Sequence, residues 1–170
     1  MGTVDVAADA HVVGTPPVPP GQLSDWIMRE VHFHGFAGLT TTRDEDVLSP
    51  EFSCFGHQWA VAIYPGGHEG EDESYVAVYL HNRSSESIVA DYKIVTKHPT
   101  NQTQRSFEAD SGDEIDEIVT FGAEGSGENS WGERNFATRG TLLTYLDNGT
   151  LTLEVHLRKN KQAEPASRLE

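Results

Sequence analysis

The segment Gln58–Gly67, QWAVAIYPGG, indicates the fold more directly than any other part of the chain. Its residues alternate in character, so Trp59, Val61 and Ile63 fall on one face of an extended strand. The Pro-Gly-Gly that follows ends the strand, because proline cannot donate to the hydrogen-bonded ladder and glycine favours a turn. We therefore expect a β-strand over 58–64, with Trp59 in the hydrophobic core.

The same period of two recurs on both sides of this segment. Alternating or apolar runs predict further strands over 31–36, 75–80, 88–96, 115–121, 142–146 and 150–157. The last two are separated by Asp147-Asn148-Gly149, which is a strong signal for a tight hairpin turn. Seven or so short strands at this spacing predict an all-β protein, either an antiparallel sandwich or a barrel.

Composition agrees with one β-rich domain and limits the partners. The chain has 170 residues, with 16 glycines and 8 prolines, which favours turns over helical bundles. Its net charge of −15 repels nucleic acid and anionic membranes. A basic protein or peptide is the partner that this charge favours, although the charge also serves solubility alone. No apolar run is long enough to span a membrane, and the N-terminus lacks the pattern of a secretion signal.

Both ends of the chain differ from the middle. Residues 1–22 contain mainly small and apolar residues and end in PPVPPG, which predicts a disordered, extended leader. Residues 161–170 are polar and predict a disordered tail. The sequence thus predicts one folded domain over 23–160.

Residues able to support catalysis or bind metal are sparse. The single cysteine, Cys54, excludes an internal disulfide and indicates a reducing compartment, the cytosol or the nucleus. No basic residue adjoins it, so we expect a small buried residue and not a nucleophile. His32 and His34 point the same way on a strand but lack a third ligand at a suitable spacing. We therefore expect no catalytic residues, no metal and no cofactor.

Three aromatic residues suggest where a partner could bind. Tyr79 and Tyr92 lie on strands that we expect to be neighbours, joined by the turn over 82–87. Trp131 follows a Gly/Ser-rich loop, Gly122–Ser130, and its context predicts exposure. Such residues give large contact areas in binding grooves, yet the same spacing also fits three core residues.

Six segments in order carry a resemblance to a known family. From residue 31 to about residue 158, the chain resembles a MATH domain, a TRAF-like β-sandwich of about eight antiparallel strands. The matching segments are His34–Leu39 (HGFAGL), Leu48–Phe52 (LSPEF), Trp59–Gly67 (WAVAIYPGG), Tyr75–Leu80 (YVAVYL), Trp131–Phe136 (WGERNF) and Tyr145–Leu153 (YLDNGTLTL).

The resemblance implies a non-enzymatic module that binds a short extended peptide. In the speckle-type POZ family, and in the ubiquitin-specific protease that carries this domain, the peptide lies across a sheet face beside the Trp-Gly segment. By motif position, Tyr79 and Tyr92 match the aromatic residues of that groove, and Trp131 and Gly132 match its wall.

Three rim positions depart from the speckle-type pattern. Ser130 stands where aspartate is usual, Glu133 where an aromatic residue is frequent, and Asn129 where lysine is frequent. The loss of a lysine and the gain of a glutamate favour a more basic peptide than the Ser/Thr-rich motif of that group.

The resemblance leaves three cellular roles open. The first is substrate recruitment to a cullin-type ubiquitin ligase, through a BTB domain that this chain lacks and that would also provide oligomerisation. The second is the targeting domain of a ubiquitin-specific protease. The third is a TRAF-type receptor-tail scaffold, which the absence of heptads in residues 1–22 disfavours.

Overall fold

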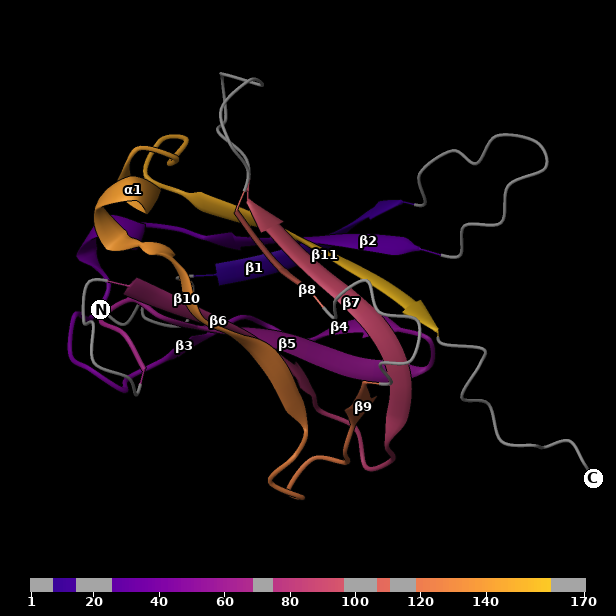
Figure 1. The fold of residues 1–170 in the computed structure, drawn as a ribbon. Coiled ribbons are helices and arrows are strands. Elements are labelled where there is room, and N and C mark those ends of the chain that lie inside the picture. The colour runs from indigo at the N-terminus through magenta and orange to yellow at the C-terminus, as the bar shows by residue number, and fades with distance from the viewer. Residues whose placement is uncertain (1–7, 15–25, 69–74, 97–106, 111–118, 160–170) are drawn as a thin grey trace, which may run out of the picture.

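Two antiparallel β-sheets pack face to face in the computed structural model (Figure 1). The structure describes residues 8–14, 26–68, 75–96, 107–110 and 119–159. This architecture confirms the predicted all-β antiparallel sandwich and excludes the barrel.

The sheet that we call sheet A contains six of the described strands. Their order is β1 (Ala8–Gly14), β2 (Ile27–Phe33), β11 (Leu151–Lys159), β7 (Ile88–Thr96) and β8 (Phe107–Asp110), and β9 (Thr120–Phe121) pairs with the other end of β7. Sheet B contains five. Their order is β10 (Ser130–Thr138), β6 (Tyr75–Asn82), β5 (His57–Tyr64) and β3 (Val47–Leu48), and β4 (Phe52–Cys54) also pairs with β5.

The core forms between the sheets from the inward residues of each strand. Trp59 is fully buried there, as its alternation predicted, and its ring meets Phe121 edge-on at 5.0 Å. Its indole nitrogen donates a hydrogen bond to the carbonyl of Cys54 at 2.9 Å, so the one polar atom of the side chain is satisfied. Burial raises the pKa of the Cys54 thiol to about 11, against a smaller opposing effect of Arg29. Cys54 is therefore an unreactive, buried thiol, as expected.

The predicted strand over 142–146 is wrong. The chain there forms a short helix, α1 (Arg139–Leu143), whose first turn is capped by the Thr138 hydroxyl accepting from the Thr141 N–H at 3.2 Å. Leu142 and Tyr145 are buried three residues apart, which is helical and not strand spacing. The expected turn does form, because Asn148 and Gly149 have φ of 54° and 83°, but it joins the segment after α1 to β11.

The N-terminal region also differs from the prediction of a disordered leader. Residues 8–14 form β1, which pairs antiparallel with β2. The composition of this segment offers little side-chain burial, but an edge strand is also stabilised by its backbone hydrogen bonds. Residues 1–7, 15–22 and 161–170 lie outside the described residues.

Two other strands have bounds that differ from the predicted ones. The predicted first strand, 31–36, lies earlier, at Ile27–Phe33. The buried Phe36 begins a 3₁₀ turn, η2 (Phe36–Gly38). Within the predicted strand over 115–121, β9 occupies 120–121 and residues 115–118 lie outside the described residues.

Candidate functional site

Strand β10 is the terminal strand of sheet B among the described residues, and its register divides the predicted site between two faces. Gly132 pairs with Tyr79, whereas Trp131 pairs with Leu80. Directly opposite residues on antiparallel strands share a face, and successive residues alternate. Leu80 is fully buried in the core, so Tyr79 and Gly132 lie on the outer face of sheet B. Trp131 lies on the opposite side of the same strand.

Gly132 is required by the close approach of β10 to Tyr79. A Cβ at this position would lie 2.6 Å from the Tyr79 Cα and 2.8 Å from its Cδ2, and it would clash with the carbonyl oxygen of Val78. The tyrosine ring therefore lies directly beside the Cα atom of the glycine. A side chain at position 132 would separate the two strands.

Tyr79 belongs to an aromatic cluster on this outer face, which we define as Tyr64, His68 and Tyr79. The His68 ring stacks on Tyr64 at 4.2 Å and 24°, and it meets Tyr79 at 5.6 Å and 87°. The two tyrosine rings are 5.9 Å apart at 84°. Sequence analysis identified Tyr79 alone. Tyr64 is the last residue of the neighbouring strand β5, and His68 reaches the cluster through the turn after β5.

Trp131 is 43% exposed, in agreement with its predicted exposure. Its indole nitrogen donates a hydrogen bond to the carbonyl of Thr120 at 2.8 Å, and Thr120 lies in β9 of sheet A. Trp131 thus spans from the edge of one sheet to the other, with its orientation fixed and part of its ring open to solvent.

The structure separates Tyr92 from the other predicted site residues. Strand β7 lies in sheet A and β6 in sheet B, so the predicted pairing of these strands is wrong. The Asn82–Ser87 turn instead carries the chain across the sandwich. Tyr92 is only 3% exposed and meets Phe121 edge-on at 5.8 Å. It is in phase with the buried residues Ile88, Ala90 and Ile94, a signal that the sequence already contained.

Asn82 fixes the loop before Trp131, and sequence analysis missed this role. Its backbone N–H donates to the Asn129 carbonyl at 2.8 Å, and the Asn129 side chain donates to the Asn82 carbonyl at 2.9 Å. The Asn82 amide also donates to the Gly122 carbonyl at 3.0 Å. The Gly/Ser-rich loop is therefore bound at both ends to the end of β6. Asn129 has a positioning role here.

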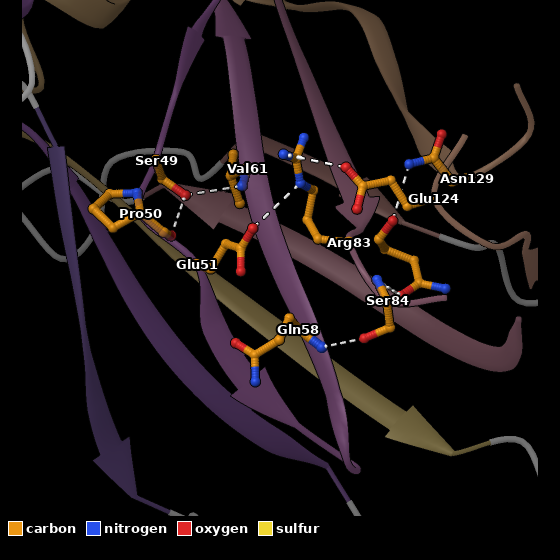
Figure 2. A network of polar contacts seen from close by, with 10 residues as sticks. Ser49, Pro50, Glu51, Gln58, Val61, Arg83, Ser84, Glu124 and Asn129 are labelled. Atoms are coloured by element: carbon orange, nitrogen blue, oxygen red, sulfur yellow. Dashed lines mark hydrogen bonds and ion pairs between the residues drawn. The ribbon is translucent and has the colours of Figure 1, made fainter. Parts of the chain in front are cut away.

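A second set of contacts extends this anchor toward β5 (Figure 2). Arg83 lies between two carboxylates, with its nitrogens 3.5 Å from Glu51 and 3.3 Å from Glu124. The Ser84 hydroxyl accepts from the Gln58 N–H at 2.7 Å. These contacts cross-link the residue before β4, the start of β5, the end of β6 and the loop that precedes β10.

His81 shares the outer face with Tyr79, two residues along β6, and pairs with Ser130. Its Nε2 atom is buried and has no hydrogen-bond partner. Burial lowers its pKa below 6.5, and Arg83 adds to this shift, while Asp46 and Glu124 oppose it. His81 is therefore neutral at pH 7.

His32 and His34 lie on the outer face of sheet A. The Nδ1 atom of His32 is 2.9 Å from the Thr152 hydroxyl, and that of His34 is 3.0 Å from the Thr150 hydroxyl. Among the described residues, no group of three or more candidate ligands could hold a metal ion. Within the same residues, no helix is long and apolar enough to cross a membrane.

The fold and this site define an antiparallel β-sandwich of the TRAF-like class. The family model for the MATH domain matches residues 31–157, and the chain belongs to the MATH domain family. Domains of this family are generally protein-interaction modules, typically without catalytic activity.

Sixty chains of solved structures also match. One is TRAF5 of Notothenia coriiceps, at 10% identity and a TM-score of 0.50, covering 80% of this chain and 74% of that one. At this identity, the likeness shows the fold alone. No curated protein matches.

Proposed function

We propose that the domain binds a short extended segment of a partner protein along the Ser130–Glu133 edge of β10. The observation that carries the proposal is the alternation of β10, which directs Gly132 toward Tyr79 and Trp131 toward the opposite face. An added strand has the same alternation, so its successive side chains would meet these two surfaces in turn.

Tyr79 and Trp131 are the proposed anchors. Each combines a large apolar area with an orientation fixed by neighbouring groups, the arrangement typical of residues that dominate binding energy. Gly132 gives the partner access to the Tyr79 ring, while Ser130 and Glu133 line the edge and Asn129 holds the preceding loop. Tyr92 is buried, which supports a core role and places it outside the proposed contact residues.

The proposed partner segment is basic. Glu133 is exposed on β10, and the protein has a net charge of −15. Complementary charge favours encounter and selects among partners more than it adds to affinity. The single cysteine, which indicates a reducing compartment, favours a cytosolic or nuclear partner.

We further propose that the bound segment is a substrate being recruited to a cullin-type ubiquitin ligase, with a BTB domain as the link. The two other roles predict different outcomes in cells. Co-purification of the full-length protein with a cullin would support recruitment. Deubiquitinating activity in the purified full-length protein, or association with receptor tails, would contradict it.

A peptide-library selection on this chain tests the binding proposal. Replacing Tyr79 or Trp131 by alanine should weaken the selected peptide about thirtyfold, the effect of removing a 2 kcal/mol anchor. Trp26→Ala is the matched control, because this aromatic residue contacts Arg158, 4.5 Å from its ring centroid, and not the β10 edge. Unchanged affinity in both anchor variants would contradict the proposed site.

A further inference from the structure

We propose that the aromatic cluster and Asp44 form a receptor for one basic side chain, an arginine or a lysine, of the bound segment. This inference rests on the proposed function and assigns to it a specificity pocket on the outer face of sheet B. The four residues concerned are Asp44, Tyr64, His68 and Tyr79.

The rings present the electrostatics that a cation favours. The planes of Tyr64 and His68 are nearly perpendicular to Tyr79, at 84° and 87°, so each packs against Tyr79 in an edge-to-face arrangement. Ring faces are electron-rich, and a guanidinium or ammonium group over such a face is attracted to it. Perpendicular packing also holds the Tyr79 ring in one orientation before any partner binds.

Asp44 supplies the negative charge, and its position is fixed twice. Its Oδ1 lies 3.0 Å from the His68 Nδ1, and its backbone N–H donates to the Gly67 carbonyl at 2.8 Å. Its φ of 67° is a left-handed conformation that few residues other than glycine adopt. The Asp44 side chain is nevertheless 54% exposed. A carboxylate held this firmly and still reaching solvent is suited to meet a cation.

Gly132 opens the route from the edge of β10 to this cluster. Neighbouring strands lie about 4.8 Å apart, so Tyr79 is one strand inward from the edge. Because position 132 has no side chain, the edge of the Tyr79 ring lies over the glycine, where an aliphatic stem from a segment bound along β10 can reach it. Arginine and lysine are the residues whose stems place a charge so far from their own backbone. Shorter side chains would stop above Gly132.

The test separates the effect of the charge on the peptide side chain from the effect of its shape. Peptides are first selected from a random library with the wild-type chain, and the enriched basic position is then replaced by norleucine, which keeps the stem and removes the charge. Both peptides are titrated against the wild type and Asp44→Asn. Asparagine tolerates the left-handed conformation, and its side-chain oxygen can still accept from His68, so the fold should be retained. Glu86→Gln, on the exposed β6–β7 turn, is the matched control for net charge.

We expect enrichment of arginine or lysine at one position, and a loss of about tenfold in affinity for the basic peptide on Asp44→Asn. The norleucine peptide should bind the wild type and Asp44→Asn equally, and Glu86→Gln should bind like the wild type. A selected peptide that needs Tyr79 but shows no basic enrichment would overturn this inference and the proposed basic preference, and would leave the proposed binding edge of β10 standing. An equal loss for both peptides would overturn this inference alone. Failure to select any peptide would overturn both.

Discussion

The two outer faces of the sandwich have opposite chemistry. On sheet A, Glu30 and Glu154 lie directly opposite each other, and each is 3.2 Å from a histidine two residues along its own strand. On sheet B, one cross-strand row contains Leu48, Ala62, Tyr79 and Gly132. The first face satisfies its polar groups internally and meets water, whereas the second combines small residues with aromatic rings. The second face is therefore the one on which we propose that a partner is recognised, because short side chains there lie beside aromatic rings.

The largest expected effect separates two tyrosines that the sequence alone does not distinguish. Tyr92→Ala should lower the free energy of unfolding by about 3–5 kcal/mol, as for other buried aromatic residues, because Tyr92 packs between the sheets. Tyr79→Ala should cost less, since its ring lies on the outer face of sheet B. Urea denaturation of both variants measures the difference. Equal losses would mean that Tyr79 is also a core residue.

Gly132→Ala should destabilise by about 1–3 kcal/mol, since the added Cβ clashes with the backbone of Val78 and Tyr79. Gly140→Ala is the matched control, because a Cβ there meets nothing within 4 Å and alanine favours the α1 helix. Thermal melts of the two variants should therefore shift in opposite directions. If Gly132→Ala left the melting temperature unchanged, β10 would lie less close to β6 than in this structure.

His81 should make stability depend on pH. Its pKa is lowered in the folded state, so the unfolded chain binds more protons as the pH falls below 6.5. The free energy of unfolding therefore has its full value, as far as His81 is concerned, above pH 6.5, and it decreases as the pH falls toward 5. His81→Gln removes this titrating group, so the gap between the wild type and the variant should change over that interval. A gap that stays constant between pH 7 and pH 5 would contradict the burial of His81.

The smallest effect is expected on sheet A. Glu154→Gln removes a partly exposed partner of His156 but also relieves repulsion from Glu30, so stability should change by less than about 0.5 kcal/mol. Chemical denaturation at pH 7 checks this value. A loss comparable to that of Gly132→Ala would mean that the two faces do not differ as described.

Sequence patterns predicted the strands whose alternation is unbroken. Strand β7 matches its predicted bounds, and β5 differs by one residue. Strand β10 was missed because it contains the polar run Glu-Arg-Asn and its register shifts between Glu133 and Ala137, which hides the period of two. Propensity likewise gave no sign of the short helix α1, which buries Leu142, or of the turn after it, which buries Tyr145.

The candidate site was predictable only in part. The motif identified Tyr79, Trp131 and Gly132, but not that the tryptophan and the glycine face opposite sides of β10. Asn82, His68 and Asp44 were missed because their partners are distant in sequence, and hydrogen bonds of this kind become visible only after the sheets are assembled.

Strand β1 affects how this domain can be excised. The family match begins at residue 31, within β2, so a chain cut there would lose β1 and the first half of β2. Strand β11 would then be left with unpaired backbone groups along part of sheet A. Such an open edge is a template for pairing with other chains, so a fragment of this kind is expected to aggregate even though every proposed contact residue is retained.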